Sequence, residues 1–143
     1  MPSLVASWQF WALLSAGFAA VTAILAKLGV SDLNPDFASL LRTVVILFVL
    51  IALVTATGQW QPLGQISLRA AVFLALSGLA TGASWLCYFR ALKLGDAARV
   101  APIDKLSVVF VAILAVVILG EKFSALHWVG VGLIGAGAPI LAL

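Results

Sequence analysis

The sequence predicts an all-α, polytopic membrane protein with five transmembrane helices in one compact bundle. Hydrophobic residues make up 64% of its 143 residues and charged residues only 9%, whereas a soluble domain averages about 45–50% apolar and about 25% charged residues. The apolar residues form five stretches, each long enough to cross a hydrocarbon core of roughly 30 Å as a helix of about 20 residues. Backbone groups in lipid must be hydrogen-bonded within their own segment, so helices are expected. The predicted spans are residues 8–28, 37–57, 69–92, 98–119 and 125–143, which together form a single domain over residues 1–143.

Aromatic and capping residues define the first two spans. Trp8 and Trp11 stand at the start of the first span, at the depth where aromatic rings favour the membrane interface. Gly29 follows that span and predicts a C-terminal cap. Asn34 and Pro35 begin the second span, because an asparagine side chain caps a helix and proline fits the first helical position.

Turn residues separate the remaining spans. Gly58 ends the second span, and Ser67 is placed to cap the third. A Gly-Asp turn at 95–96 precedes the fourth span. A tight turn at 120–122 precedes the fifth, which Ser124 is placed to cap. Because the connections are short, neighbouring helices are expected to be antiparallel and packed.

Basic residues are distributed unevenly between the two sets of helix ends. Arg69 and Lys122 flank one set, whereas the other set carries Lys27, Arg90, Lys93 and Arg99. Cytoplasmic loops of membrane proteins carry an excess of lysine and arginine. We therefore expect the N-terminus outside and the C-terminus in the cytoplasm, with the chain in a bacterial cytoplasmic (inner) membrane.

Three charged residues, Arg42, Asp104 and Lys105, lie inside predicted spans. Arg42 and Asp104 both lie roughly 8–10 Å from the cytoplasmic ends of their helices at a rise of about 1.5 Å per residue. A charge at the membrane centre costs about 2.5–3.5 kcal/mol, so a partner is expected. Equal depth makes Arg42 the predicted partner of Asp104, either as a gating or coupling pair or as a structural one. Lys105 either attracts an anionic solute or extends to the interface.

Pro102, near the start of the fourth span, has two interpretations. It removes a backbone donor and loosens the turn beside Asp104, or it marks a late helix start.

A polar and aromatic stripe runs along the third span. Its members are spaced at i, i+3, i+4 and i+7 and share one helix face, and Ser107 adds a hydroxyl one turn beyond Asp104. They either line a wet substrate cavity or serve helix packing through local hydroxyl bonds to the backbone. The stripe consists of Thr81, Ser84, Trp85 and Tyr88.

Small residues predict close helix packing in two spans. They lie in the third and fifth spans, where they let helix backbones approach one another, and the glycine face of the fifth span suits an oligomer interface. The glycines are Gly78, Gly82, Gly130, Gly132, Gly135 and Gly137.

Several classes of function are excluded. The lone Cys87 and the lone His127 have no further ligands at metal-binding spacing, so neither a metal nor a cofactor is expected. The chain lacks paired carboxylates, a Ser/His/Asp set and a glycine-rich phosphate loop, which argues against an enzyme. No basic run interleaved with aromatic residues suggests nucleic-acid binding.

The segment from Tyr88 to Ser107, YFRALKLGDAARVAPIDKLS, resembles the third-to-fourth helix segment of EamA-type proteins in the drug/metabolite transporter superfamily. The Gly-Glu turn within residues 119–122, the Trp128-Val-Gly130 run and the position of Arg42 are similar as well. The resemblance covers nearly the whole chain. It implies a transporter or exporter of small metabolites that works by alternating access, with substrate held near the midplane between repeats.

Larger EamA-type proteins resemble two such halves fused as an inverted repeat, so this chain resembles the short members that act as dimers. Its first span carries no acid, unlike that of the related four-helix exporters, and their proton-coupling mechanism is not carried over. The charge bias favours one orientation, hence a parallel homodimer or an inverted homologous partner. A lipid or lipid-linked substrate flippase and a non-transporting membrane subunit of a larger complex are the alternatives.

Overall fold

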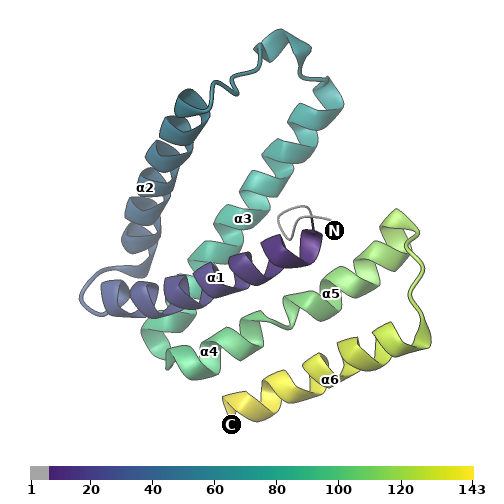
Figure 1. The fold of residues 1–143 in the computed structure, drawn as a ribbon. Coiled ribbons are helices and arrows are strands. Elements are labelled where there is room, and N and C mark those ends of the chain that lie inside the picture. The colour runs from purple at the N-terminus through teal and green to yellow at the C-terminus, as the bar shows by residue number, and fades with distance from the viewer. Residues whose placement is uncertain (1–6) are drawn as a thin grey trace. The chain divides into compact units, whose positions relative to one another are not determined.

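Helices account for most of the chain in a computed structural model that describes residues 7–143 (Figure 1). No strand occurs among these residues, so the all-α class is confirmed. Residues 1–6 of the predicted domain, which include the N-terminus predicted to be extracytoplasmic, are not among the described residues. The elements are α1 (Trp8–Val30), α2 (Pro35–Ala56), η2 (Leu63–Gln65), α3 (Leu68–Leu94), α4 (Ala97–Asp104), α5 (Ser107–Leu114), η3 (Ala115–Leu119) and α6 (Ala125–Ala142).

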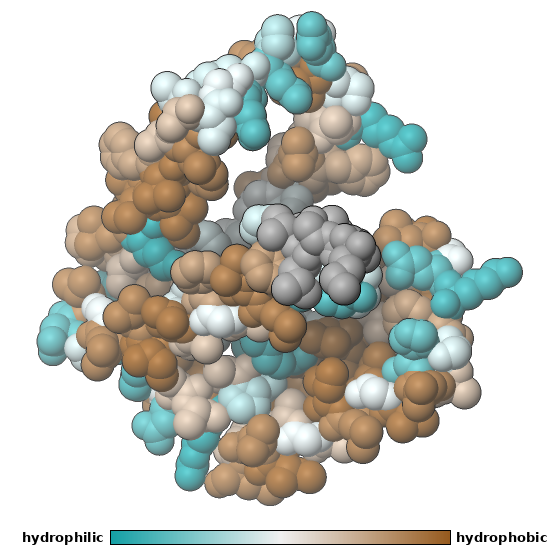
Figure 2. Space-filling model, in the orientation of Figure 1, coloured by the Kyte–Doolittle hydropathy of each residue, from teal (hydrophilic) through white to brown (hydrophobic). Residues whose placement is uncertain are grey.

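Five helical segments of the described chain are long and apolar enough to cross a membrane, as predicted. They are α1, α2, α3, the segment Ala97–Leu119 and α6, with mean hydropathies between 1.6 and 2.7. At most 11% of the most apolar window in each segment is buried within the protein. Figure 2 shows hydrophobic side chains covering α2, while hydrophilic ones gather on the connection that follows it. Water would be a poor solvent for such surfaces, and a lipid bilayer satisfies them.

The described chain divides into two units. One unit holds the chain up to Leu28 together with Leu94–Leu143, and in it α6 packs against α4 and α5. The other unit is Gly29–Lys93, which contains α2, η2 and nearly all of α3. Within this second unit, α2 and α3 approach each other at the end that begins α2 and diverge toward η2 (Figure 1).

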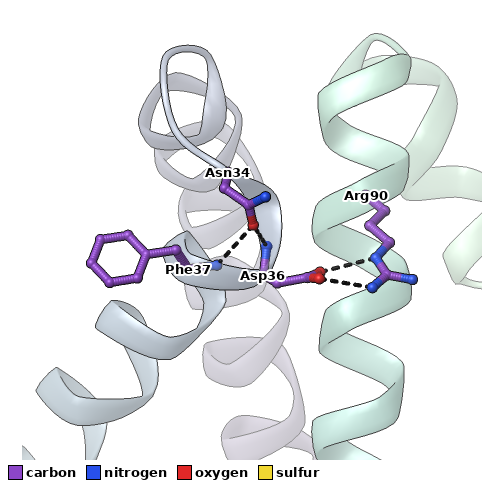
Figure 3. Close-up of polar contacts among 4 residues, drawn as sticks. All are labelled: Asn34, Asp36, Phe37 and Arg90. Carbon is purple, nitrogen blue, oxygen red and sulfur yellow. Dashed lines mark hydrogen bonds and ion pairs between the residues drawn. The ribbon is translucent and has the colours of Figure 1, made fainter.

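Three helix starts follow the predicted capping. The Asn34 side-chain oxygen accepts bonds from the backbone N–H groups of Asp36 at 2.9 Å and Phe37 at 3.2 Å (Figure 3). Ser67 accepts from the N–H of Ala70, and Ser124 accepts from that of His127. Each cap satisfies N–H groups that the first helical turn leaves without a partner.

The predicted cap at Gly29 is wrong, because α1 continues through Gly29 to Val30. Only Gly58 and Gly120 have positive φ among the described residues, at 64° and 69°. The carbonyls at the end of α1 are satisfied by a side chain instead. Lys93 donates to the Val30 carbonyl at 3.0 Å and also to that of Ser31, which is the favourable place for a cation near a helix C-terminus.

The fourth span, expected as one helix over 98–119, is divided. It starts at Ala97 with Pro102 inside α4, so the late-start interpretation of Pro102 is wrong. The helix breaks at Lys105–Leu106, where the N–H of Leu106 donates to the Ile103 carbonyl at 3.0 Å in a three-residue step. Proline has no N–H and clashes with the carbonyl four residues earlier, so its direct effect is on the turn before it, whereas the break lies after it. The break falls immediately after the predicted intramembrane acid, Asp104.

Candidate functional site

The most distinctive charged group of the spans is Arg42, the eighth residue of α2. Its guanidinium carbon lies 4.3 Å from the ring centroid of Trp85 and 5.6 Å from that of Phe89, both on α3. The Arg42 side chain is partly buried, and Phe89 is 3% exposed. A cation over an aromatic face is stabilised by about 0.5–1 kcal/mol when exposed and about 2 kcal/mol when desolvated. The arginine is thus held by aromatic rings roughly 10 Å along α2 from its start.

The structure brings together two residues to which the sequence analysis gave different roles. Arg42 was predicted as a gating or coupling residue, and Trp85 was predicted to line the cavity. Tyr88, which stands three residues after Trp85, is partly buried. Sequence reasoning missed Phe89. It stands four residues after Trp85, so helical spacing from Trp85 was the signal that would have found it.

The hydroxyl members of the stripe behave differently from its aromatic members. The Thr81 hydroxyl donates to the Ser77 carbonyl at 2.9 Å, a bond within its own helix. Ser84 is exposed. A threonine bonded to the preceding turn fits the packing interpretation, whereas Trp85, one of the aromatic members, lies against a charge. The cavity-lining role of all four residues stays a prediction.

Both acids of the unit Gly29–Lys93 have other partners. Asp36 forms a two-bond ion pair with Arg90, at 2.9 Å to Nε and 2.7 Å to Nη2 (Figure 3). Asp32 accepts from the Ser31 hydroxyl at 3.2 Å. Within the described residues 29–93, no carboxylate pairs with Arg42. The Asp36–Arg90 pair joins α2 to α3 with side chains 44% and 60% exposed, respectively, so its main effect is to fix register.

Asp104 and Lys105 lie at the break in the fourth span. Lys105 Nζ is 3.3 Å from Asp104 Oδ2, although neighbouring residues on a regular helix point about 100° apart. The broken helix permits this approach, which the sequence analysis did not anticipate. Ser107 is exposed at the start of α5. Arg42 belongs to the other unit, and its pairing with Asp104 stays a prediction.

An apolar groove of about 450 Å³ lies between α4 and α6. Lys105 is the charged residue among those that line the groove, and Pro102 lines it as well. The lining residues are Ala101, Pro102, Lys105, Ile134, Gly137, Ala138 and Leu141.

One of the predicted packing glycines makes a close approach within its unit. A Cβ at Gly135 would lie 3.4 Å from Cγ2 of Val109, which places α6 against α5 at that point. At the other five positions a Cβ would meet no described atom within 4 Å. These open positions are Gly78, Gly82, Gly130, Gly132 and Gly137.

Replacing Gly135 by Leu is expected to destabilise the protein, because the side chain must displace Val109. Overpacking of this kind costs about 1–3 kcal/mol. Gly17→Leu, at an open position of α1 outside the glycines assigned to packing, is the control and should leave the unfolding temperature in detergent nearly unchanged. Equal unfolding temperatures for the two variants would contradict the assigned α5–α6 contact.

His127 Nδ1 is 2.6 Å from the Ser124 hydroxyl, and Cys87 is an exposed free thiol. No three histidine, cysteine or acidic side chains of residues 7–143 gather as a metal site would require.

Five apolar helices and an arginine held on aromatic rings inside one of them define a multi-pass α-helical membrane protein. The model of the EamA-like transporter family matches residues 6–143. A Sinorhizobium sp protein described as "Uncharacterized transporter in cobO 3'region" is 67% identical over 137 residues, which are 96% of this chain and 97% of that protein. The chain belongs to the EamA-like transporter family, and it is a membrane transporter. No solved structure matches it.

Proposed function

We propose that this protein moves a small polar metabolite across the bacterial cytoplasmic membrane by alternating access, as a dimer. The observation that carries the proposal is Arg42, a partly buried cation inside a span, held against Trp85 and Phe89. Ionisable residues within spans are costly and commonly mark solute pathways. The polar and aromatic stripe of α3 supplies further contacts, and Asp104 with Lys105 lies at a helix break of the kind that lines transporter sites.

Uptake from a labelled metabolite mixture tests this function whichever compound is the substrate. Purified protein is reconstituted in liposomes, incubated with a uniformly ¹³C-labelled bacterial metabolite extract, and the vesicle contents are identified by mass spectrometry. Accumulation of a polar compound beyond that in protein-free vesicles supports the proposal. Vesicles that match the protein-free control would favour a non-transporting membrane subunit.

A lipid or lipid-linked substrate is the second candidate, and the groove between α4 and α6 is the observation in its favour. Its walls are apolar, and Lys105 stands beside them as a cation for an anionic headgroup. A flippase predicts that fluorescent lipids in the reconstituted vesicles equilibrate between leaflets, measured as the fraction bleached by external dithionite. Bleaching that stops at half would leave the polar-metabolite proposal in place.

Open small-residue positions support the proposed dimer. Glycines on α3 and α6 leave room for the backbone of another helix. An inverted homologous chain is the alternative partner. Cross-linking in native membranes followed by mass determination distinguishes a homodimer from a pair of different chains.

Reporter fusions at the C-terminus should show it in the cytoplasm, because the set of helix ends that includes the C-terminus carries more lysine and arginine than the other set. Alkaline phosphatase reports an external terminus and green fluorescent protein reports an internal one, both at native expression. Signal from the internal reporter alone supports a parallel dimer or an inverted partner. Comparable signals from both would overturn the single orientation and favour an antiparallel homodimer.

A further inference from the structure

The guanidinium of Arg42 is presented in a way that suits recognition of an anion. Trp85 and Phe89 lie 4.3 and 5.6 Å from it and engage the cation through their rings. Where a ring stacks on the face of a guanidinium, the N–H donors at its edge stay available for an acceptor. Those donors form a planar fork that matches the two oxygens of a carboxylate.

The charge around Arg42 is not balanced within its own unit. The acids of residues 29–93 are Asp32 and Asp36, which are bonded to Ser31 and Arg90. Arg42 therefore holds a positive charge inside α2 with aromatic rings and no carboxylate of its own unit. Such a cation attracts an anion more strongly than an exposed arginine does, because the surrounding dielectric is lower.

We propose that Arg42 binds the carboxylate of an anionic substrate, with Trp85 and Phe89 holding the guanidinium in place. This inference rests on the proposed transport function and names the substrate class. Both carboxylate and phosphate accept two parallel bonds from the fork. A carboxylate fits better because one guanidinium neutralises its single negative charge, whereas phosphate carries more than one at neutral pH. The predicted partner Asp104 is itself a carboxylate, so substrate and Asp104 would be alternatives for the same cation.

The experiment compares acids with their neutral amides on the full-length protein in detergent. Benzoate, phenylacetate and succinate are titrated beside benzamide, phenylacetamide and succinamide, with inorganic phosphate as a tetrahedral anion and chloride matching the ionic strength. A ligand that binds the folded state raises the thermal unfolding midpoint. We expect at least one acid to raise it and its amide to leave it unchanged.

Variants assign the effect to Arg42. Arg42→Gln should weaken the apparent affinity for that acid about 10- to 100-fold, as loss of a charged hydrogen bond does. Arg42→Lys keeps the charge without the fork, so its apparent affinity should lie between those of the unmodified protein and Arg42→Gln. If the glutamine variant fails to fold, the lysine variant tests the role of the fork in its place. Arg69→Gln is the matched control, because Arg69 lies 5.9 Å from the ring centroid of Phe73 at the start of α3.

Three results would overturn the inference: stabilisation by none of the acids, equal stabilisation by acids and amides, or equal loss in the Arg69 and Arg42 variants. Stronger stabilisation by phosphate than by every acid would also overturn the carboxylate assignment. The proposed function fails separately. If an acid binds through Arg42 but no metabolite accumulates in vesicles, the proposed transport is wrong and the anion site stands. If only neutral compounds accumulate, the transport function stands and the carboxylate site is wrong.

Discussion

Arg42→Asp and Asp104→Arg should each lower the thermal unfolding midpoint in detergent and lower metabolite flux at least about tenfold, and the double variant that exchanges the two charges should recover most of the midpoint. Each single variant places charges of one sign at both positions inside the membrane, which is costly, and the exchange restores opposite charges to the predicted pair. Flux should stay low in the double variant, because Arg42 is also the proposed contact for the substrate carboxylate. The measurements are the unfolding midpoint and initial uptake into proteoliposomes with protein amounts matched by immunoblot.

The exposed pair Asp36–Arg90 provides the control for this exchange. Its side chains are 44% and 60% exposed, so Asp36→Arg and Arg90→Asp should change flux much less than the Arg42 and Asp104 variants. If the unfolding midpoint of the double Arg42–Asp104 variant stays as low as those of the single variants, the two residues do not act as a pair, and Arg42 would be left with its role toward the anion alone.

Trp85→Ala should abolish most metabolite flux while expression and membrane insertion persist. The substitution removes the ring that lies closest to the Arg42 guanidinium, 4.3 Å away, and frees the cation to change its orientation. Trp85→Phe keeps an aromatic face and should retain part of the flux. Uptake of the accumulated metabolite into proteoliposomes measures the effect.

Trp60→Ala is the matched tryptophan control. Trp60 is 63% exposed, lies between α2 and η2, and its indole N–H donates to the Thr55 hydroxyl at 3.2 Å. Its removal should leave uptake close to that of the unmodified protein. Normal flux in Trp85→Ala would place the substrate site elsewhere in the chain.

The amino-acid sequence by itself determined the class of this protein. Long apolar stretches require helices in lipid, and the observed helices cover the five predicted spans. Local chemistry also placed helix starts correctly at Asn34 and Ser124, because a cap depends on residues within one turn. The motif of residues 88–107 led to the family, which the match over residues 6–143 establishes.

Tertiary structure decided the features that depend on residues far apart in the chain. Lys93 satisfies the end of α1 from a distance of more than 60 residues, so Gly29 was not needed as a cap. The ring contacts of Arg42 and the Asp36–Arg90 pair likewise join α2 to α3, and no spacing within either helix specifies them. Pro102 left both a loosened turn and a late helix start open, and only the structure shows that the proline lies inside α4 and that the break follows Asp104.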